Sequence, residues 1–401
     1  MKRVALIMPY GGVGGIERLV AYLYTHYKNL NYTVKVIKII KLDTDLVQFG
    51  EDEYALSECD FIEMSKVGRL LFYLQAPIHL RRILKQEAIT HSIAFGDMAN
   101  LFSSLTFTNE YKVASIHALK SVEFLNPSYI NTVYKLAYRT TYNKFNKVVC
   151  ISKSIRRDLI DKCNFKFHDK LKVIYNPHDI ELIRQKAIQP LESFEEMYFE
   201  GKTILFLGRI SLQKAPWHLI KSFSILSKQL EKVTLVFVGD GDPSVQAYCN
   251  HLVNHFQLEN KVLFLGRRDN PYKYLKRSDV VALSSYYEGT PNVIVEAIAL
   301  GIPVVTSNCT DGIIELMTSS PPLITEEGFY ETETGIITPS FFKGQFNIPN
   351  SDDYIQEEYA FSNALLRVIE GYKTNDDFQH VQKDLLKKFE LNQVAANYFK
   401  D

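Results

Sequence analysis

A strand–loop–helix–strand unit between residues 280 and 306 restricts the fold of this chain more than any other feature. Its first strand is expected at the apolar run Val280–Leu283. Pro291 stands where the helix should begin, since the first helical position tolerates a missing N–H. Apolar residues then recur at helical spacing, at Val293, Ile294, Ala297, Ile298 and Leu300. Gly301 should end the helix before a second strand at Val304–Thr306. A helix between two such strands is typical of a parallel α/β sheet.

Two carboxylates accompany this helix, Glu288 in the loop before it and Glu296 within it. Ligands of open α/β sheets bind at the carboxyl edge of the strands, where a helix N-terminus also attracts anions. Glu296 stands among apolar residues, so it should either face a crevice or have its burial compensated. The loop acid, the helix N-terminus and the helix acid together suit a nucleotide sugar, with phosphates at the helix and hydroxyl groups on the acids.

The run EGTPNVIVEAIALGIPVV, which starts at Glu288, resembles the signature segment of glycosyltransferase family 4. Two glutamates eight residues apart are common, but the Gly-Thr-Pro-Asn and Gly-Ile-Pro-Val-Val flanks make the match specific. The alternative is a solvated loop glutamate beside a helix-capping network. The resemblance extends over nearly the whole chain and is most specific over 200–315, where it points to members that build bacterial surface polysaccharides.

Membership of this family implies the α/β fold called GT-B: two doubly wound Rossmann-like domains, an interdomain cleft, and a C-terminal helix that crosses back to the first domain. Residues 1–180 would form the acceptor-binding domain, with a helix at about 385–401 packed on it. Residues 181–384 would form the nucleotide-sugar-binding domain. The chain length of 401 residues is sufficient for two such domains.

Other segments carry weaker structural signals. Residues 41–65 and 318–352 should be irregular, the second around one late strand, and residues 352–401 should be helical throughout. The pattern of Lys66–Gln86 predicts a helix that is kinked or split at Pro77, because proline lacks the N–H that an inner turn requires.

Composition limits the class of protein. Its 46% hydrophobic and 23% charged residues are those of a soluble globular protein, and a formal net charge of zero argues against binding nucleic acid by bulk electrostatics. Five scattered cysteines without a C-x-x-C pattern indicate a reducing compartment, with neither a disulfide framework nor a zinc site. The start of the chain reads as a strand that ends at Pro9 and not as a secretory signal. We expect a cytoplasmic protein.

The N-terminal half offers a glycine-rich turn and a histidine. The turn contains Gly11, Gly12, Gly14 and Gly15. It does not complete the G-x-G-x-x-G pattern, because Glu17 takes the place of the third glycine, and this disfavours NAD. The resemblance places Gly14 and Gly15 against the donor diphosphate, although a simple tight turn would look the same. It also places His117, at the end of a strand, where many members have a histidine facing the reacting sugar. A histidine with a purely structural role is the alternative.

The second half offers two cations. Arg209 follows a strand and Lys214 precedes a helix, which resembles the Gly-Arg…Lys-Gly motif of the family with Ala215 in place of the second glycine. Breaking the sugar–phosphate bond leaves a diphosphate of growing negative charge, which these cations could neutralise without proton transfer. Two solvated surface cations are the alternative. The implied donor-binding residues are Gly14, Gly15, Gly208, Gly239, Arg267, Thr290, Pro291, Asn292, Val293 and Glu296.

These features predict a retaining hexosyl- or N-acetylhexosaminyltransferase. It would move a sugar from a nucleotide-diphosphate donor, expected to be a UDP-sugar, to a hydroxyl of a saccharide or lipid-linked saccharide. The predicted catalytic residues are His117, Arg209, Lys214 and Glu288. The resemblance implies no cofactor and no obligatory metal. A nucleotide-sugar epimerase of the same architecture and a non-catalytic nucleotide-sugar-binding partner subunit remain as alternatives. A glycoside hydrolase is disfavoured, because its two carboxylates face each other across the bond whereas these two lie on one unit.

Two stretches, Lys66–Lys85 and Tyr129–Lys147, combine basic with large apolar and aromatic residues. Such faces can lie on an anionic membrane and bring an enzyme to a lipid-linked acceptor. An ordinary amphipathic helix with a basic rim is the slightly favoured interpretation, and the membrane interpretation gains support from the recurrence of the pattern in both stretches. No apolar run reaches the roughly 18 residues of a membrane-spanning helix, so the contact would be peripheral, on the inner face of the cytoplasmic membrane.

Overall fold

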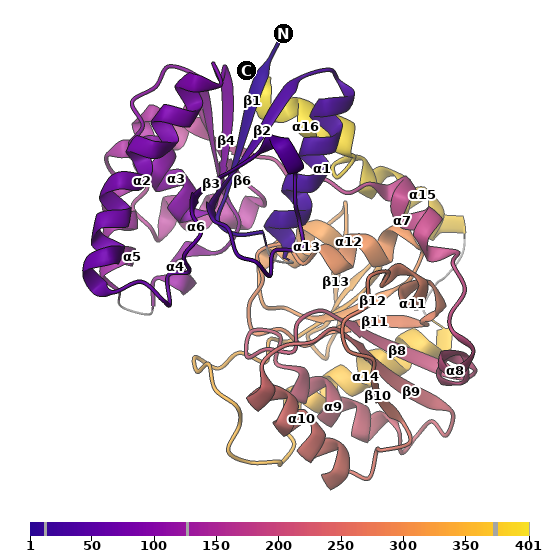
Figure 1. Cartoon of the computed structure of the whole chain (residues 1–401). Coiled ribbons are helices and arrows are strands. Elements are labelled where there is room, and N and C mark those ends of the chain that lie inside the picture. Colours follow the sequence, from indigo (N-terminus) through magenta and orange to yellow (C-terminus); the bar gives the residue numbers. More distant parts are fainter. Residues whose placement is uncertain (12–13, 126–127, 372–375, 401) are drawn as a thin grey trace. The chain divides into compact units, whose positions relative to one another are not determined.

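The computed structural model describes residues 1–11, 14–125, 128–371 and 376–400, and it divides into two compact units (Figure 1). The N-terminal unit comprises Met1–His178 together with Phe389–Asp401. The C-terminal unit comprises Asp179–Lys388. Each unit is built on a largely parallel sheet flanked by helices.

The N-terminal unit contains a seven-stranded parallel sheet in the order β3-β2-β1-β4-β5-β6-β7. The strands are β1 (Arg3–Met8), β2 (Thr33–Ile40), β3 (Glu53–Ser57), β4 (His91–Phe95), β5 (Tyr111–Ile116), β6 (Lys147–Cys150) and β7 (Leu171–Val173). Successive side chains of β1 alternate between two cores: Val4 and Leu6 lie in one, Ala5 and Ile7 in the other. Both faces of the sheet are therefore covered, which explains the unbroken apolar run of this strand.

The helices of this unit are α1 (Gly15–Asn29), α2 (Lys66–Gln86), α3 (Asp97–Ser104), α4 (Lys120–Glu123), α5 (Tyr129–Ala137), α6 (Lys153–Asp161) and α16 (Leu391–Phe399). Short 3-10 turns occur at Gly50–Asp52, Thr141–Lys144 and His168–Lys170. The last helix, α16, packs against α1 (Figure 1). There the hydroxyl of Tyr27 donates a hydrogen bond to the Ala395 carbonyl (2.9 Å), and Lys147 Nζ donates one to the Asn397 carbonyl (2.9 Å). The C-terminal helix of the chain thus belongs to the first unit, as the fold class predicts.

The C-terminal unit contains an eight-stranded sheet in the order β10-β9-β8-β11-β12-β15-β14-β13. The strands are β8 (Lys202–Leu207), β9 (Val233–Val238), β10 (Val262–Phe264), β11 (Val280–Leu283), β12 (Val304–Ser307), β13 (Leu323–Ile324), β14 (Tyr330–Thr332) and β15 (Gly335–Thr338). All neighbours pair parallel except β13 with β14 and β14 with β15. The chain winds outward from β8 on one side and from β11 on the other, so the topological switch point lies between these two strands.

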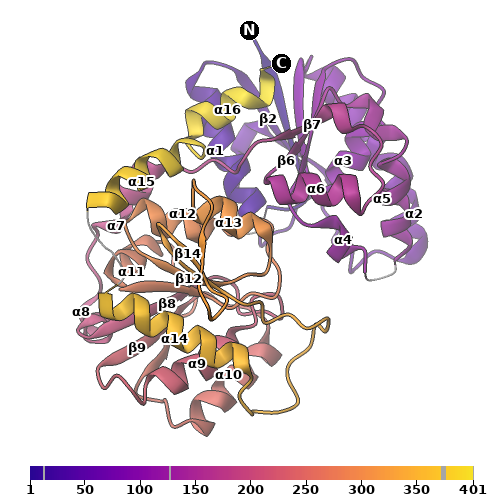
Figure 2. The same ribbon diagram turned by 180° about the vertical axis from the view of Figure 1, so that it is seen from behind.

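The helices of the C-terminal unit are α7 (Ile180–Ala187), α8 (Ser193–Glu196), α9 (Pro216–Leu226), α10 (Pro243–His255), α11 (Tyr272–Arg277), α12 (Asn292–Ala299), α13 (Asp311–Met317), α14 (Gln356–Gly371) and α15 (Asp376–Lys387), with a 3-10 turn at Met197–Phe199. On one face of the sheet, α9 and α14 lie side by side (Figure 2). The core on this face joins Trp217 of α9, Phe237 of β9 and Phe361 of α14, all buried.

Several weak sequence signals gave wrong predictions. The region expected to be irregular at 41–65 contains β3, an edge strand whose residues are all half-buried and therefore lack an apolar pattern. The region at 318–352 contains β13 and β14. Of the two outcomes predicted at Pro77, a kink or a split, the split does not occur: α2 is one helix, in which Ala76, Pro77 and Leu80 are buried together, and this packing compensates for the lost hydrogen bond.

The prediction that residues 352–401 are helical throughout is wrong, because among the described residues of this stretch 352–355, before α14, and 388–390, between α15 and α16, are not helical. The stretch Tyr129–Lys147 is also not one helix: it comprises α5, a 3-10 turn and the first residue of β6.

Candidate active site

The candidate site of the C-terminal unit lies at the carboxyl ends of β8 and β11. These strands are parallel neighbours, with Val280 opposite Ile204 and Val281 opposite Leu205. Consequently the loop that carries Arg209 after β8 and the loop that carries Glu288 after β11 leave the sheet at the same edge. This edge at a topological switch point is where ligands of open α/β sheets bind.

Helix α12 begins one residue later than the sequence predicts. Pro291 has extended backbone angles (φ −67°, ψ 110°) and precedes the first helical residue, Asn292. Because its ψ is not helical, Pro291 is the last residue of the loop and is not part of the first helical turn. The predicted C-terminus is confirmed: Gly301 has a φ of +75°. The Gly301 N–H bonds to the Ile298 carbonyl (3.0 Å) and the Ile302 N–H to the Ala297 carbonyl (2.9 Å), which is the Schellman pattern.

Lys214 and Glu288 form an ion pair between Nζ and Oε1. Glu288 is only 6% exposed, and its Oε1 also accepts a hydrogen bond of 2.8 Å from the Ser285 hydroxyl. A buried carboxylate held by a cation and a hydroxyl has a defined orientation. The structure thus joins a predicted phosphate-binding cation to a predicted sugar-binding acid.

The loop that carries Glu288 is held from several directions. The Ser284 hydroxyl donates to the carbonyl of Ala215 (3.0 Å), and the Ser307 hydroxyl donates to the carbonyl of Ser285 (2.7 Å). The Tyr286 N–H bonds to the carbonyl of Gln213 (2.8 Å). The loop before α9 and the loop after β11 therefore form one rigid support for the ion pair.

Ala215 and Gly239 occupy strained positions of this support. Ala215, which replaces the second glycine of the family motif, has a φ of +42°, in the left-handed region where glycine is favoured. Gly239 has a φ of +141°, and a Cβ atom there would lie 2.0 Å from the Gly208 carbonyl oxygen. The Gly239 N–H bonds to the Gly266 carbonyl (2.9 Å). The turns after β8, β9 and β10 are consequently in direct backbone contact, which requires glycine at the middle turn.

The other predicted residues of this unit lie along the same edge. Arg209 follows β8 and Arg267 follows β10, and both side chains are exposed. Glu296 is buried within α12 and only 3% exposed. Thr290 and Asn292, on either side of Pro291, are partly exposed, whereas Val293 is buried.

Three further residues of this edge were not singled out from the sequence. Ser285 precedes Glu288 by three residues, and a hydroxyl at this spacing was the signal that could have identified it. Gly312 lies against the Gly289 carbonyl, since an added Cβ would approach that oxygen to 2.7 Å. Asp242, in the sequence Asp240-Gly241-Asp242 after β9, caps α10 and accepts hydrogen bonds from the Ser244 N–H and hydroxyl (2.8 and 2.6 Å).

The thiol of Cys309 is held protonated near this site. Burial, and then the negative charge of Glu288, raise the pKa of Cys309 well above its usual value. All five cysteines of the chain are free thiols. A buried, protonated thiol fits a packing role for Cys309.

The residues predicted in the N-terminal unit follow β1 and β5. Gly14 precedes the first turn of α1 and Gly15 is its first residue, whereas Gly12 lies outside the described residues. His117 follows β5, with its ring 6.0 Å from that of Phe95. Its Nε2 is buried and finds no hydrogen-bond partner among the described residues.

The imidazole of His117 is neutral. Burial, assisted by the nearby positive charge of Lys120, lowers the pKa of His117 to about 3. That charge is itself held in place by Asp97, whose carboxylate lies 2.8 Å from Lys120 Nζ. A neutral imidazole with an unsatisfied buried nitrogen can accept a hydrogen bond from a ligand or donate one to it. It cannot act as a general acid at neutral pH, because its remaining N–H does not give up its proton at that pH.

Comparisons with known proteins agree with this architecture. Residues 13–182 match the family "Glycosyltransferase Family 4" and residues 192–321 match "Glycosyl transferases group 1". A GalNAc transferase of Campylobacter jejuni that acts on an N-acetylgalactosamine-N,N'-diacetylbacillosaminyl-diphospho-undecaprenol is 27% identical, over 100% of this chain and 99% of its own length. An uncharacterized glycosyltransferase of Methanocaldococcus jannaschii is 27% identical over a segment that covers 59% of this chain. The same segment covers 58% of the length of that relative.

Solved structures show the same fold. Anabaena HepE, crystallised with UDP and glucose, superposes with a TM-score of 0.70 at 18% identity, covering 99% of this chain and 98% of HepE. No helix in the described part of the chain is long and apolar enough to cross a bilayer.

The two matched segments, one in each α/β unit, confirm both the GT-B fold and the resemblance noted in the sequence: this chain belongs to the glycosyltransferases, with a Family 4 domain followed by a group 1 domain.

Proposed function

We propose that this glycosyltransferase moves an N-acetylhexosamine or hexose from a UDP-sugar to a hydroxyl of a lipid-linked saccharide, with retention of anomeric configuration. The observation that carries the proposal is the Lys214–Glu288 ion pair at the switch point of the C-terminal unit. The full-length Campylobacter jejuni relative, which acts on an undecaprenol-linked substrate, supports the choice of acceptor.

Lys214 and Arg209 would stabilise the departing diphosphate. Lys214 is held by Glu288 and partly exposed, whereas Arg209 is exposed and makes no ion pair within the described part of the chain. Cations placed beside the leaving group provide electrostatic stabilisation as negative charge develops on it. We propose that they replace a metal ion in this role.

The carboxylates would select the donor. Glu288 would bind hydroxyls of the transferred sugar through the oxygen that does not accept from Ser285, and Glu296 would bind the ribose hydroxyls. Backbone N–H groups between Thr290 and Val293 would contact the donor at the start of α12. His117, neutral as its lowered pKa requires, would hydrogen-bond the reacting sugar, and Gly14 and Gly15 would allow close approach of the diphosphate.

We also propose that the N-terminal unit contacts the membrane peripherally. One face of α2 is exposed and apolar: Val67 (68%), Leu70 (61%), Leu71 (50%), Leu74 (62%) and Ile78 (65%). Arg81, Arg82 and Lys85, which are also exposed, follow this face toward the C-terminal end of the helix, and Arg69 is exposed in its first turn. An apolar stripe with a cationic border is the composition of helices that lie on anionic bilayers.

Helix α5 has the same character. Tyr129 is 98% and Leu136 60% exposed. Both α2 and α5 pack against α3, and Figures 1 and 2 show them on the same flank of the N-terminal unit. Next to α5 a hollow of about 460 Å³ is lined by Lys135, Arg139 and Lys162 together with Phe124 and Leu136. Cations beside apolar surface suit an acidic lipid head group at the inner face of the cytoplasmic membrane.

The test is an acceptor-dependent release assay. The protein is incubated with UDP-N-acetylhexosamines and UDP-hexoses, with and without an undecaprenyl-diphosphate-linked saccharide, and UDP is measured. We expect UDP release only when one donor and the acceptor are both present. Conversion of one UDP-sugar into another without an acceptor would instead indicate an epimerase. Binding without turnover under every condition would indicate a partner subunit.

A further inference from the structure

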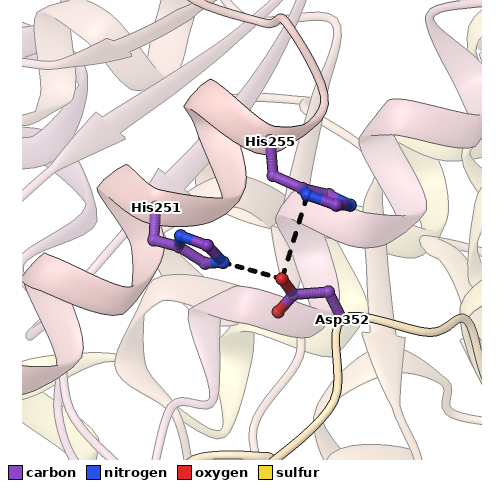
Figure 3. Close-up of side chains that lie close together, drawn as sticks. All are labelled: His251, His255 and Asp352. Atoms are coloured by element: carbon purple, nitrogen blue, oxygen red, sulfur yellow. Dashed lines mark hydrogen bonds and ion pairs between the residues drawn. The ribbon is translucent and has the colours of Figure 1, made fainter.

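Three side chains that the site does not use converge on the surface of the C-terminal unit (Figure 3). His251 and His255 lie four residues apart on α10, so they share one face of the helix. Asp352, from the segment before α14, faces both rings (Figure 3). His251 Nε2 is 2.7 Å and His255 Nδ1 is 4.0 Å from Asp352 Oδ2. The three candidate ligand atoms all lie within 4.8 Å of one another.

The position of Asp352 is set by its neighbours. Lys221 Nζ donates hydrogen bonds to the carbonyls on either side of it, those of Ser351 (3.1 Å) and Asp353 (2.8 Å). The Tyr248 hydroxyl donates to Asp352 Oδ1 (3.1 Å), which leaves Oδ2 directed at the two imidazoles. Ligating carboxylates in metal sites are commonly oriented by such a second hydrogen bond. The aspartate is therefore held in place before any ligand binds.

We propose that His251, His255 and Asp352 bind a divalent transition-metal ion, with Zn²⁺ as the expected ion. Two imidazole nitrogens and one carboxylate oxygen are a common zinc ligand set, and water would complete a tetrahedral sphere. Ca²⁺ and Mg²⁺ are disfavoured because they prefer oxygen ligands. Both histidines have about half of their side-chain surface exposed (55% and 49%), so their rings can rotate to bring the nitrogens to bonding distance. The ion would replace the His251–Asp352 hydrogen bond.

A bound ion would connect two parts of the unit that are distant in sequence. It would tie the end of α10 to the segment that leads into α14, the helix that packs against α9. Such a ligand stabilises the folded chain because it binds the native arrangement and not the separated residues. The role is structural and independent of sugar transfer, since none of the three residues belongs to the proposed donor site.

The test uses the full chain, freed of metal with a chelator and then dialysed. Zn²⁺ is titrated by calorimetry, and Co²⁺ is followed by its visible absorption as a probe of tetrahedral coordination. We expect one ion per chain with a micromolar or lower dissociation constant, and a rise of the unfolding temperature that saturates at one equivalent. The variants His255→Ala and Asp352→Asn should each weaken binding at least tenfold and abolish the temperature rise.

His79→Ala is the matched control, because His79 is an exposed histidine on another helix, α2, of the other unit. It should leave the zinc affinity unchanged. The metal-free variants should unfold at the temperature of the metal-free wild type to within a few degrees, which shows that they fold. The proposal is wrong if wild type and His255→Ala bind Zn²⁺ equally, or if binding needs millimolar metal. Because the readouts are affinity and unfolding, they do not depend on whether the chain transfers sugar.

Discussion

Lys214 and Glu288, 74 residues apart in the sequence, form an ion pair at the carboxyl ends of the neighbouring strands β8 and β11. The Ser285 hydroxyl donates to the same carboxylate oxygen, so Glu288 is oriented by two donors. The cation expected to stabilise the leaving diphosphate is thereby positioned by the acid expected to bind the sugar. A substitution of either residue therefore also removes a binding partner of the other.

Replacing Lys214 with alanine should lower turnover strongly. Loss of one charge-stabilising donor in a water-excluded site costs about 3 kcal/mol, which is roughly a 150-fold reduction in kcat. The measurement is steady-state UDP release with saturating acceptor. Lys232→Ala removes an exposed cation of the same unit and should change kcat less than twofold. Wild-type turnover in the Lys214 variant would contradict its proposed role.

The Lys214→Ala protein should also lose stability, because Glu288 would be left buried without its cation. Combining it with Glu288→Gln removes that uncompensated charge. We expect the double variant to unfold at a higher temperature than Lys214→Ala alone while remaining inactive. Recovery of activity together with stability would show that the lysine acts only by supporting the fold.

Glu296→Gln should weaken donor binding without unfolding the chain, since glutamine keeps the size of a side chain that is 3% exposed. The dissociation constant for UDP, measured by calorimetry, should rise about tenfold if one charge-assisted hydrogen bond of ~1.5 kcal/mol is lost. Glu259→Gln changes an exposed glutamate of the same unit and should leave the affinity unchanged. Equal UDP affinities in all three proteins would place the ribose elsewhere.

Gly239→Ala should destabilise the C-terminal unit by about 2–3 kcal/mol, because the added Cβ meets the Gly208 carbonyl and the φ of +141° is unfavourable for alanine. The check is the denaturation midpoint in urea. Gly371→Ala is the control, since its added Cβ meets no atom within 4 Å and its φ is not in the left-handed region. An equally small effect of both changes would mean that the turn after β9 can move away without cost.

The pKa of His117, lowered to about 3 mainly by burial, predicts a specific pH dependence. An unfolded histidine titrates near 6.5, so below that pH the unfolded chain binds a proton that the folded chain does not. Stability should therefore be complete above pH 6.5 and decline as the pH falls from 6.5 toward 3. His117→Gln should show a smaller decline in unfolding temperature between pH 7 and pH 4.5. A parallel decline in both proteins would show that His117 is protonated in the folded state.

Binding to vesicles tests the membrane surface of α2. Leu70→Glu combined with Leu74→Glu puts two charges on its exposed apolar face and should reduce co-sedimentation with phosphatidylglycerol vesicles at least fivefold. Ile188→Glu is the control, because Ile188 is equally apolar and 79% exposed but belongs to the C-terminal unit. If all three proteins sediment alike, the face of α2 does not contact the bilayer.

Much of the fold could be predicted because the signals that define its elements are local. The end of α12 follows from Gly301, whose positive φ and two backbone hydrogen bonds involve only residues within five positions. The buried strands were visible as apolar runs, since a parallel sheet covered on both faces excludes water along the whole strand. The family resemblance of the Glu288–Val305 run rests on the same local constraints.

Contacts between groups that are distant in the sequence could not be predicted from it. The edge strand β3 and the short strand β14, which lies next to the edge strand β13, consist mostly of half-buried residues and have no apolar run, so their pairing depends on the neighbouring strands. The Lys214–Glu288 pair and the approach of Asp352 to His251 span 74 and 101 residues. Sequence spacing carries no information about such contacts, because packing of the sheet and its helices sets the distances between these side chains. Local sequence patterns therefore sufficed for the family, the apolar strands and the end of α12, whereas the packing of the sheet set which side chains meet in the site.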